Sequence, residues 1–209
     1  MQFLTRPLCA LAAAGLFAGC AGMSEQACLA SDWRAVGFED GAAGRPVTAI
    51  GGYRQACSKH GVAPDLDRYR AGHGEGVEVY CRPSHGFEVG RRGSAYQGVC
   101  PADVEPDFLS AYGSGRHLYD LESALRRIDG RIAGNHRAQD GIEQELTAIA
   151  ASMVSDDTSA EERIALVARA AELGRRYGEL SAEIEALAHE RIAHERELVE
   201  YRQTLAFGF

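Results

Sequence analysis

Four cysteines carry the clearest chemical signal in this chain: Cys28, Cys57, Cys81 and Cys100. Their spacings are 29, 24 and 19 residues, and no two of them form a CxxC pair. Zinc sites bring two ligands within a few residues of each other, so these spacings argue against a metal. An even number of cysteines in a glycine-rich, exported segment indicates two disulfides. Three pairings are possible, and the sequence does not choose among them.

Two glutamates at equivalent places in similar octapeptides are candidates for acid–base chemistry. Residues 37–44 read GFEDGAAG and residues 86–93 read GFEVGRRG, which aligns Glu39 with Glu88. Glycosidases use two carboxylates about 5–10 Å apart. The simpler interpretation, which we favour, is that each glutamate caps or solvates its own short element. We therefore assign no catalytic residue and expect a protein that is not an enzyme, with a hydrolase as the weaker hypothesis.

Tyrosines recur through the first half of the chain and suggest a ligand surface. Stacked on sugar rings, they would hold a glycan or another small ligand, and the candidates are Tyr69, Tyr80, Tyr96 and Tyr112. More often, such tyrosines connect the core to solvent. His189 and His194 imitate the HExxH pattern of zinc proteases, but a separation of five residues places them about 140° apart around a helix. We predict no metal and no cofactor.

The N-terminal residues carry a targeting signal. Arg6 is the only charged residue before an apolar run at 8–18, which is shorter than the roughly 20 residues that span a bilayer. Residues 16–20, LFAGC, resemble the lipobox of bacterial lipoproteins. We expect residues 1–19 to be a signal peptide and Cys20 to carry acyl chains such as palmitate; the alternative is a secreted protein in which Cys20 is an ordinary thiol. The residue after Cys20 is Ala21, and not the aspartate that signals retention in the inner membrane. The resemblance therefore implies an outer-membrane anchor facing the periplasm.

The elements that position these residues fall into two parts that meet near residue 105. Residues 20–105 are rich in Cys, Gly and Tyr, whereas residues 106–209 are rich in Ala, Glu, Leu and Arg. Matches between the two copies continue after the octapeptides, which indicates a degenerate tandem duplication. The later pairs are Tyr53 with Tyr96, Cys57 with Cys100, Tyr69 with Tyr112 and Gly72 with Gly115. We expect short glycine-rich helices stabilised by disulfides, with a mixed α+β module as the alternative.

Residues 106–209 show the heptad pattern of a coiled coil. Apolar residues alternate at spacings of three and four from Leu118 to Ile149 and again from Leu166 to Leu205. The polar residues 155–159 between these seams carry helix-start signals. The pattern predicts a long antiparallel hairpin and a mostly α fold. A chain reversal at 156–157 would bring Arg191 near Glu122.

Four polar residues interrupt the two seams: Asn135, Gln139, Arg191 and His194. A polar residue in a coiled-coil core often fixes register at a cost in stability, and this is the interpretation we favour. The alternative is that these positions accept a third helix from a partner.

A string of motifs in the first half resembles a known family. The motifs are Cys-x3-Asp-Trp at 28–33, Gly-Phe-Glu-Asp-Gly at 37–41, Tyr-x2-Gly-x3-Gly at 69–76 and Gly-x2-Gly-x2-Tyr-x-Gly-Val-Cys-Pro at 90–101. Together with the lipobox they are similar to the proteobacterial lipoproteins labelled domain of unknown function 2799, over about residues 20–121. The resemblance implies an exported, usually lipidated protein with no assigned activity, and it supplies no catalytic residues.

Charge narrows the possible partners. The formal net charge is −8 at pH 7, which disfavours binding to nucleic acid. We expect a structural or adaptor role, in which a lipid at Cys20 anchors the protein and the hairpin engages an envelope protein. A module that binds a glycan or small ligand is the alternative.

Overall fold

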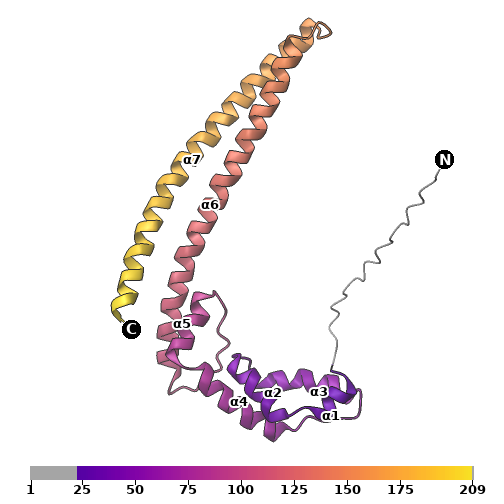
Figure 1. Ribbon diagram of the computed structural model, residues 1–209, viewed down its shortest axis with the longest axis vertical. Coiled ribbons are helices and arrows are strands. Elements are labelled where there is room, and N and C mark those ends of the chain that lie inside the picture. The colour runs from indigo at the N-terminus through magenta and orange to yellow at the C-terminus, as the bar shows by residue number, and fades with distance from the viewer. Residues whose placement is uncertain (1–22, 209) are drawn as a thin grey trace, which may run out of the picture. The chain divides into compact units, whose positions relative to one another are not determined.

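Helices dominate the computed structural model, which describes residues 23–208 (Figure 1). No strand occurs among these residues, so the mostly α fold is confirmed and the α+β alternative is not seen there. The predicted signal peptide, residues 1–19, and the predicted lipid site, Cys20, lie outside the described residues. None of the described helices is both long enough and apolar enough to cross a membrane.

The chain divides into two compact units between Tyr80 and Cys81. The change in composition near residue 105 suggested a later boundary. The difference arises because helix α5 (Pro83–Arg91), although part of the glycine-rich segment, packs along the next helix of the chain.

The first unit is built from short helices around a disulfide. Ser24 and Asp32 cap the first two helices, because their side chains accept hydrogen bonds from the backbone N–H groups of Ala27 and Arg34, at 3.2 and 3.1 Å. The core consists of Cys28, Trp33, Ile50, Cys57 and Tyr69. The elements are α1 (Glu25–Ala30), α2 (Trp33–Ala42), the 3-10 helix η1 (Val47–Ala49), α3 (Ile50–Ser58) and α4 (Leu66–Tyr80).

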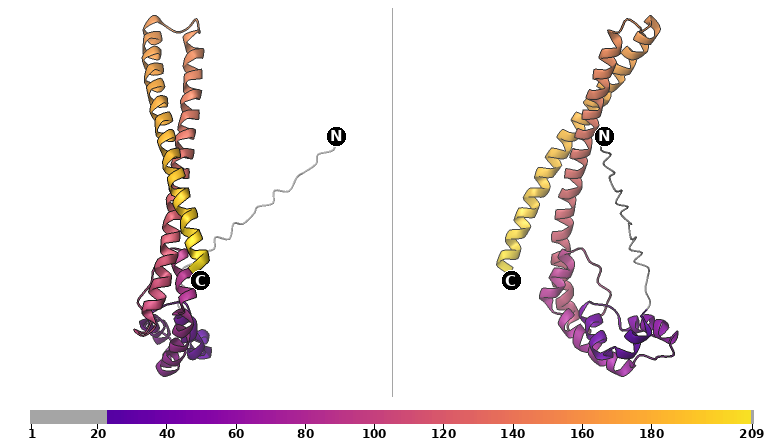
Figure 2. Two further views of the ribbon diagram at one scale, coloured as in Figure 1. Left: turned by 90° about the vertical axis from the view of Figure 1, so that its left-hand side faces the viewer. Right: turned by 45° about the vertical axis from the view of Figure 1, so that its right-hand side comes forward.

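The second unit combines α5 with two long helices, α6 (Glu105–Met153) and α7 (Ala160–Gly208). Helix α5 lies against the first part of α6, and α6 and α7 run antiparallel as a hairpin (Figure 2). Each long helix has 49 residues, which corresponds to about 74 Å. The predicted coiled-coil hairpin is therefore confirmed.

Apolar seam residues hold the hairpin together at both ends. Leu118, Leu121 and Leu198 are buried near the base, and Ile142, Ile149 and Leu173 are buried in the distal half. At the connection, Arg163 donates hydrogen bonds to the backbone carbonyl oxygens of Met153, Ser155 and Thr158. This one side chain therefore closes the turn.

The register of the hairpin differs from the predicted one. Arg191 pairs with Asp129 at 2.7 Å, and Glu122 pairs with Arg202 at 2.7 Å, so the expected Arg191–Glu122 pair is wrong. Helix α7 begins only at Ala160, because the connection occupies the residues before it. The reversal point consequently lies later in the chain, and the partners of α7 residues shift toward the tip along α6.

Candidate functional site

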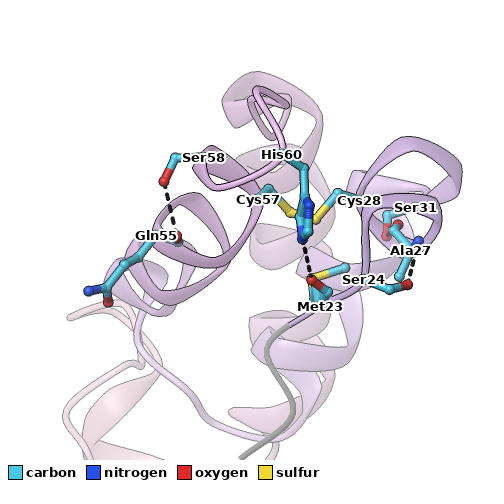
Figure 3. The surroundings of a disulfide bond; sticks show 9 residues. All are labelled: Met23, Ser24, Ala27, Cys28, Ser31, Gln55, Cys57, Ser58 and His60. Atoms are coloured by element: carbon cyan, nitrogen blue, oxygen red, sulfur yellow. Dashed lines mark hydrogen bonds between the residues drawn. A yellow bond between two sulfur atoms is a disulfide. The ribbon is translucent and has the colours of Figure 1, made fainter.

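Each compact unit contains one disulfide. Cys28 is bonded to Cys57 in the first unit, and Cys81 to Cys100 in the second, each with a Cα–Cα distance of 5.6 Å. The prediction of two disulfides is confirmed, and the structure selects this pairing. Figure 3 shows the first disulfide, where a ring nitrogen of His60 donates to the carbonyl oxygen of Met23 at 3.2 Å. The disulfide and this hydrogen bond connect the end of α3 to the start of the described chain.

Glycines bring helices α2 and α4 of the first unit into backbone contact. A Cβ atom on Gly41 would lie 2.2 Å from the carbonyl oxygen of His73, and one on Gly76 would lie 2.2 Å from that of Phe38. A side chain at either position would force the helices apart. Gly37 and Gly72 make the same kind of contact, with added Cβ atoms 2.0 and 1.9 Å from the carbonyl oxygens of Tyr69 and Arg34, so four glycines line the crossing.

The second unit repeats this crossing between α5 and α6. A Cβ on Gly90 would lie 2.2 Å from the carbonyl oxygen of Tyr112, and one on Gly115 would lie 2.1 Å from that of Phe87. The two octapeptides are thus the first helices of two copies of one helix pair. Their function is to allow close helix packing.

The structural match between the copies differs from the sequence match along the second helix. By its contacts, Gly76 corresponds to Gly115, whereas the sequence paired Gly72 with Gly115, one helical turn away. The last glycine of each octapeptide supports the structural match: Gly44, at φ +71°, contacts the Tyr80 ring, and Gly93, at φ +73°, contacts the Tyr119 ring. The same register makes Phe108, and not Tyr112, the counterpart of Tyr69.

A buried carboxylate sits beside the crossing in the first unit. Asp40 is 0% exposed and accepts hydrogen bonds from the hydroxyl groups of Tyr69, at 2.6 Å, and Tyr53, at 3.2 Å. The Arg45 guanidinium forms an ion pair with the same carboxylate. His73 stacks on the Tyr69 ring, and its ring nitrogen lies 2.8 Å from the Arg45 carbonyl oxygen. The cluster links α2, α3 and α4.

Burial and the adjacent carboxylate change the acid–base properties of the two tyrosines. Burial raises the pKa of Tyr69 well above its usual value, and the hydrogen bond to Asp40 raises this pKa further. Burial also raises the pKa of Tyr53, with a smaller contribution from the charge of Asp40. Both hydroxyl groups therefore stay protonated at neutral pH and donate to Asp40. This cluster is suited to fixing three helices in place.

The second unit has an apolar counterpart of this cluster. Val89 occupies the position of Asp40 and is buried, and Phe108 occupies that of Tyr69 and is 0% exposed. The hydroxyl group of Tyr96, the counterpart of Tyr53, donates to Glu105 at 2.8 Å and accepts from the Cys100 backbone N–H at 2.8 Å. The polar cluster thus belongs to the first unit only. The sequence signal for it is the single difference between GFED at 37–40 and GFEV at 86–89.

The candidate ligand tyrosines are mostly structural. Tyr69 and Tyr80 are buried, so neither ring presents a free face to a ligand. Tyr96 and Tyr112 are half-buried, and the Tyr112 hydroxyl donates to the Ser94 carbonyl oxygen at 3.0 Å. Two of the four side chains lie in each compact unit.

The two glutamates considered for acid–base chemistry are also separated between the units. Glu39 is exposed on α2, and Glu88 on α5 pairs with Arg91 at 3.3 Å. Glu39 therefore belongs to the first unit and Glu88 to the second.

Ion pairs link the two long helices on both flanks of the hairpin. Residues one position before the seam form ion pairs across the hairpin, Arg131 with Glu183 and Arg169 with Glu145, both at 2.7 Å. A cavity of about 520 Å³ opens on this flank near the tip, lined by Ser152, Asp157, Thr158, Glu162, Ala165, Leu166 and Arg169. The opposite flank has the Arg202–Glu122 pair near its base.

These features define a class of protein: two glycine-crossed, disulfide-bonded helix pairs, the second of which extends into a coiled-coil hairpin. Residues 32–117 match the family described as Protein of unknown function (DUF2799), the family that the sequence motifs resemble. The match covers both helix pairs and ends where α6 continues into the hairpin. Neither a curated protein nor a solved structure matches the chain.

Proposed function

We propose that this protein is a lipoprotein of the outer membrane, exposed to the periplasm, with a structural or adaptor role. The lipobox-like residues 16–20 support a lipid at Cys20. The two disulfides fit an oxidising compartment such as the periplasm. Enzymatic activity is not part of the proposal.

The hairpin is the observation that carries this proposal. Its two 49-residue helices extend far beyond the region where α5 supports α6. Large apolar side chains are exposed in its distal part, with Val154 81% exposed and Ile164 72% exposed. Apolar side chains that gather into a contiguous exposed patch are typical of interaction sites. The hairpin therefore serves as an arm that engages another envelope protein.

The anchor is tested by metabolic labelling with a palmitate analogue followed by membrane fractionation. The native chain should incorporate label and sediment with the outer membrane. Cys20→Ser should lose both properties, and Cys9→Ser, which lies within the proposed signal peptide, should keep them. Labelling that survives Cys20→Ser would exclude this anchor.

The adaptor role is tested by photo-crosslinking in intact cells, with a photoreactive residue at the exposed positions Ala138 and Ala182. We expect crosslinks to one defined envelope protein. They should disappear when residues 132–188 are replaced by a short Gly-Ser linker that keeps the base of the hairpin. If both positions crosslink only to copies of the same chain or to nothing, the adaptor role is wrong.

A further inference from the structure

Three branched apolar side chains lie exposed at the distal end of the hairpin. Val154, Ile164 and Val167 are 81%, 72% and 53% exposed. Each comes directly after a residue at a seam position, namely Met153, Arg163 and Leu166. Positions after the seam on α6 and α7 share one flank, as the Arg202–Glu122 pair near the base demonstrates. The three side chains therefore belong to the same flank.

Uncharged residues extend this surface along both helices. We call it the distal flank; its members, all exposed, are Thr147, Ala150, Val154, Ile164, Val167, Ala171, Gly174 and Gly178. A Cβ atom added to Gly174 or Gly178 would meet nothing within 4 Å, so this end of the surface is open. At the same depth the opposite flank carries the Arg169–Glu145 ion pair. The named members of the distal flank are uncharged, and the next residues of α6 on the same flank, Asp140 and Glu143, are both acidic.

The charge around the distal flank indicates what kind of partner fits. Residues 140–180 contain nine acids and four arginines, a net charge of −5. Arg163 is bonded to carbonyl oxygens of the turn, Arg169 to Glu145, and Arg175 to acids on its own helix. A second copy of this chain would bring −5 against −5. Charge complementarity therefore favours a basic partner.

We infer that the distal flank binds one amphipathic helix of a partner protein, apolar along its contact stripe and edged by lysine or arginine. The surface from Ile164 to Gly178 is about 21 Å long, which matches four turns of a helix. The branched side chains supply apolar contact, and the glycines let the incoming backbone approach closely. This inference rests on the proposed adaptor role and identifies its contact surface.

Two synthetic 21-residue helical peptides test the inference by fluorescence anisotropy with the full-length chain in detergent. Both have leucine at heptad positions a and d; one has lysine and the other glutamate along its edges. We expect the lysine-edged peptide to bind and the glutamate-edged peptide to bind at least tenfold more weakly. Equal binding of the two peptides, or no binding of the lysine-edged one, would overturn the inference.

Matched glycine variants locate the contact. Gly174→Gln/Gly178→Gln should weaken binding at least tenfold. Gly141→Gln should leave it unchanged, because Gly141 is equally open but lies on the other flank. Glutamine favours helix over glycine, so both proteins should melt no lower than the native chain, and lost binding cannot be ascribed to unfolding.

Two outcomes with the double variant count against the inference. Equal binding by the double variant and Gly141→Gln would refute it, as would self-association of the native chain that the double variant abolishes. If hairpin-dependent crosslinks in cells persist in the double variant, the adaptor role stands and only this contact surface is wrong.

Discussion

At the scale of single residues, the two helix pairs solve one packing problem with different chemistry. The first places the carboxylate of Asp40 against the hydroxyl of Tyr69, and the second has the buried Val89 and Phe108 at the same two positions. A buried charge is tolerated only when donors satisfy it, and Asp40 accepts from two tyrosines and an arginine. The aspartate and the tyrosine therefore depend on each other.

This dependence predicts a non-additive pair of substitutions. Asp40→Val leaves a buried hydroxyl without its acceptor and should lower the free energy of unfolding by about 2–4 kcal/mol. Tyr69→Phe alone should cost about 1–3 kcal/mol. The double variant reproduces the apolar pair of the second unit and should lose about 1–2 kcal/mol less than the sum. Fluorescence of Trp33, the only tryptophan and part of this core, reports urea unfolding of the unit. Simple additivity would contradict the coupling.

The raised pKa of Tyr69 predicts a loss of stability in alkali. The folded state keeps the Tyr69 proton to higher pH than the unfolded state, whose tyrosine pKa is about 10. The contribution is therefore complete below pH 10 and declines as the pH rises above it. The midpoint of urea unfolding should fall above about pH 10 more steeply in the native chain than in Tyr69→Phe. Parallel pH profiles for the two proteins would show that Tyr69 is not responsible.

At the scale of elements, the two helix crossings depend on backbone contact. A methyl group would clash with a carbonyl oxygen of the neighbouring helix at Gly41 and Gly76 in the first unit and at Gly90 and Gly115 in the second. Glycine is costly in a helix, so its recurrence at these positions is explained by packing. Gly37, Gly72 and Gly86 make the same kind of contact, whereas Gly74 and Gly113 face open space and have no such role.

Substitutions at two neighbouring glycines of α4 distinguish the packing role of glycine from its cost to helix stability. Gly76→Ala would put a Cβ 2.2 Å from the Phe38 carbonyl oxygen and should lower the free energy of unfolding by about 1–3 kcal/mol or more. Gly74→Ala meets nothing within 4 Å and should raise it by about 0.5–1 kcal/mol. Trp33 fluorescence in urea measures both. Equal effects of the two substitutions would mean that the crossing tolerates separation of the helices.

The sequence predicts some of these elements in full and others only in part. The hairpin was predictable because its apolar period continues through many heptads, and the repeat was visible because its glycines are spaced alike. The register of the repeat was not predictable from the sequence. The motif Tyr-x-x-Gly occurs at 69–72 and at 112–115 and so pairs Gly72 with Gly115, whereas the contacts pair Gly76 with Gly115. The octapeptides align Asp40 with Val89, but the polar cluster was not predictable because the sequence match pairs Tyr69 with Tyr112, and only the contacts pair it with Phe108.

At the scale of the whole molecule, each disulfide closes its own unit. Cys28–Cys57 lies in the first unit, Cys81–Cys100 in the second, and residues 101–209 contain no cysteine. Covalent stabilisation therefore applies to the two helix pairs separately. The distal hairpin relies on its seam and its ion pairs.

Reduction should consequently affect the parts unequally. Loss of Cys28–Cys57, which closes a loop of 29 residues, should lower the stability of the first unit by about 3–4 kcal/mol. The circular dichroism of the long helices should persist at reductant concentrations that change Trp33 fluorescence. Cys28→Ser/Cys57→Ser should reproduce the fluorescence change, and Cys81→Ser/Cys100→Ser should not. Simultaneous loss of both signals would indicate one cooperative structure.

The second helix of each crossing continues for a different distance beyond it. Helix α4 ends at Tyr80, whereas its counterpart α6 runs on from Tyr119 to Met153 before the chain turns. The 38 residues from Gly115 to Met153 make α6 a lever about 57 Å long with its pivot at Gly90 and Gly115. A change of about 10° in the angle at the pivot would move the far end of such a lever by about 10 Å. A small shift of α5 would therefore be magnified into a displacement about as wide as one helix.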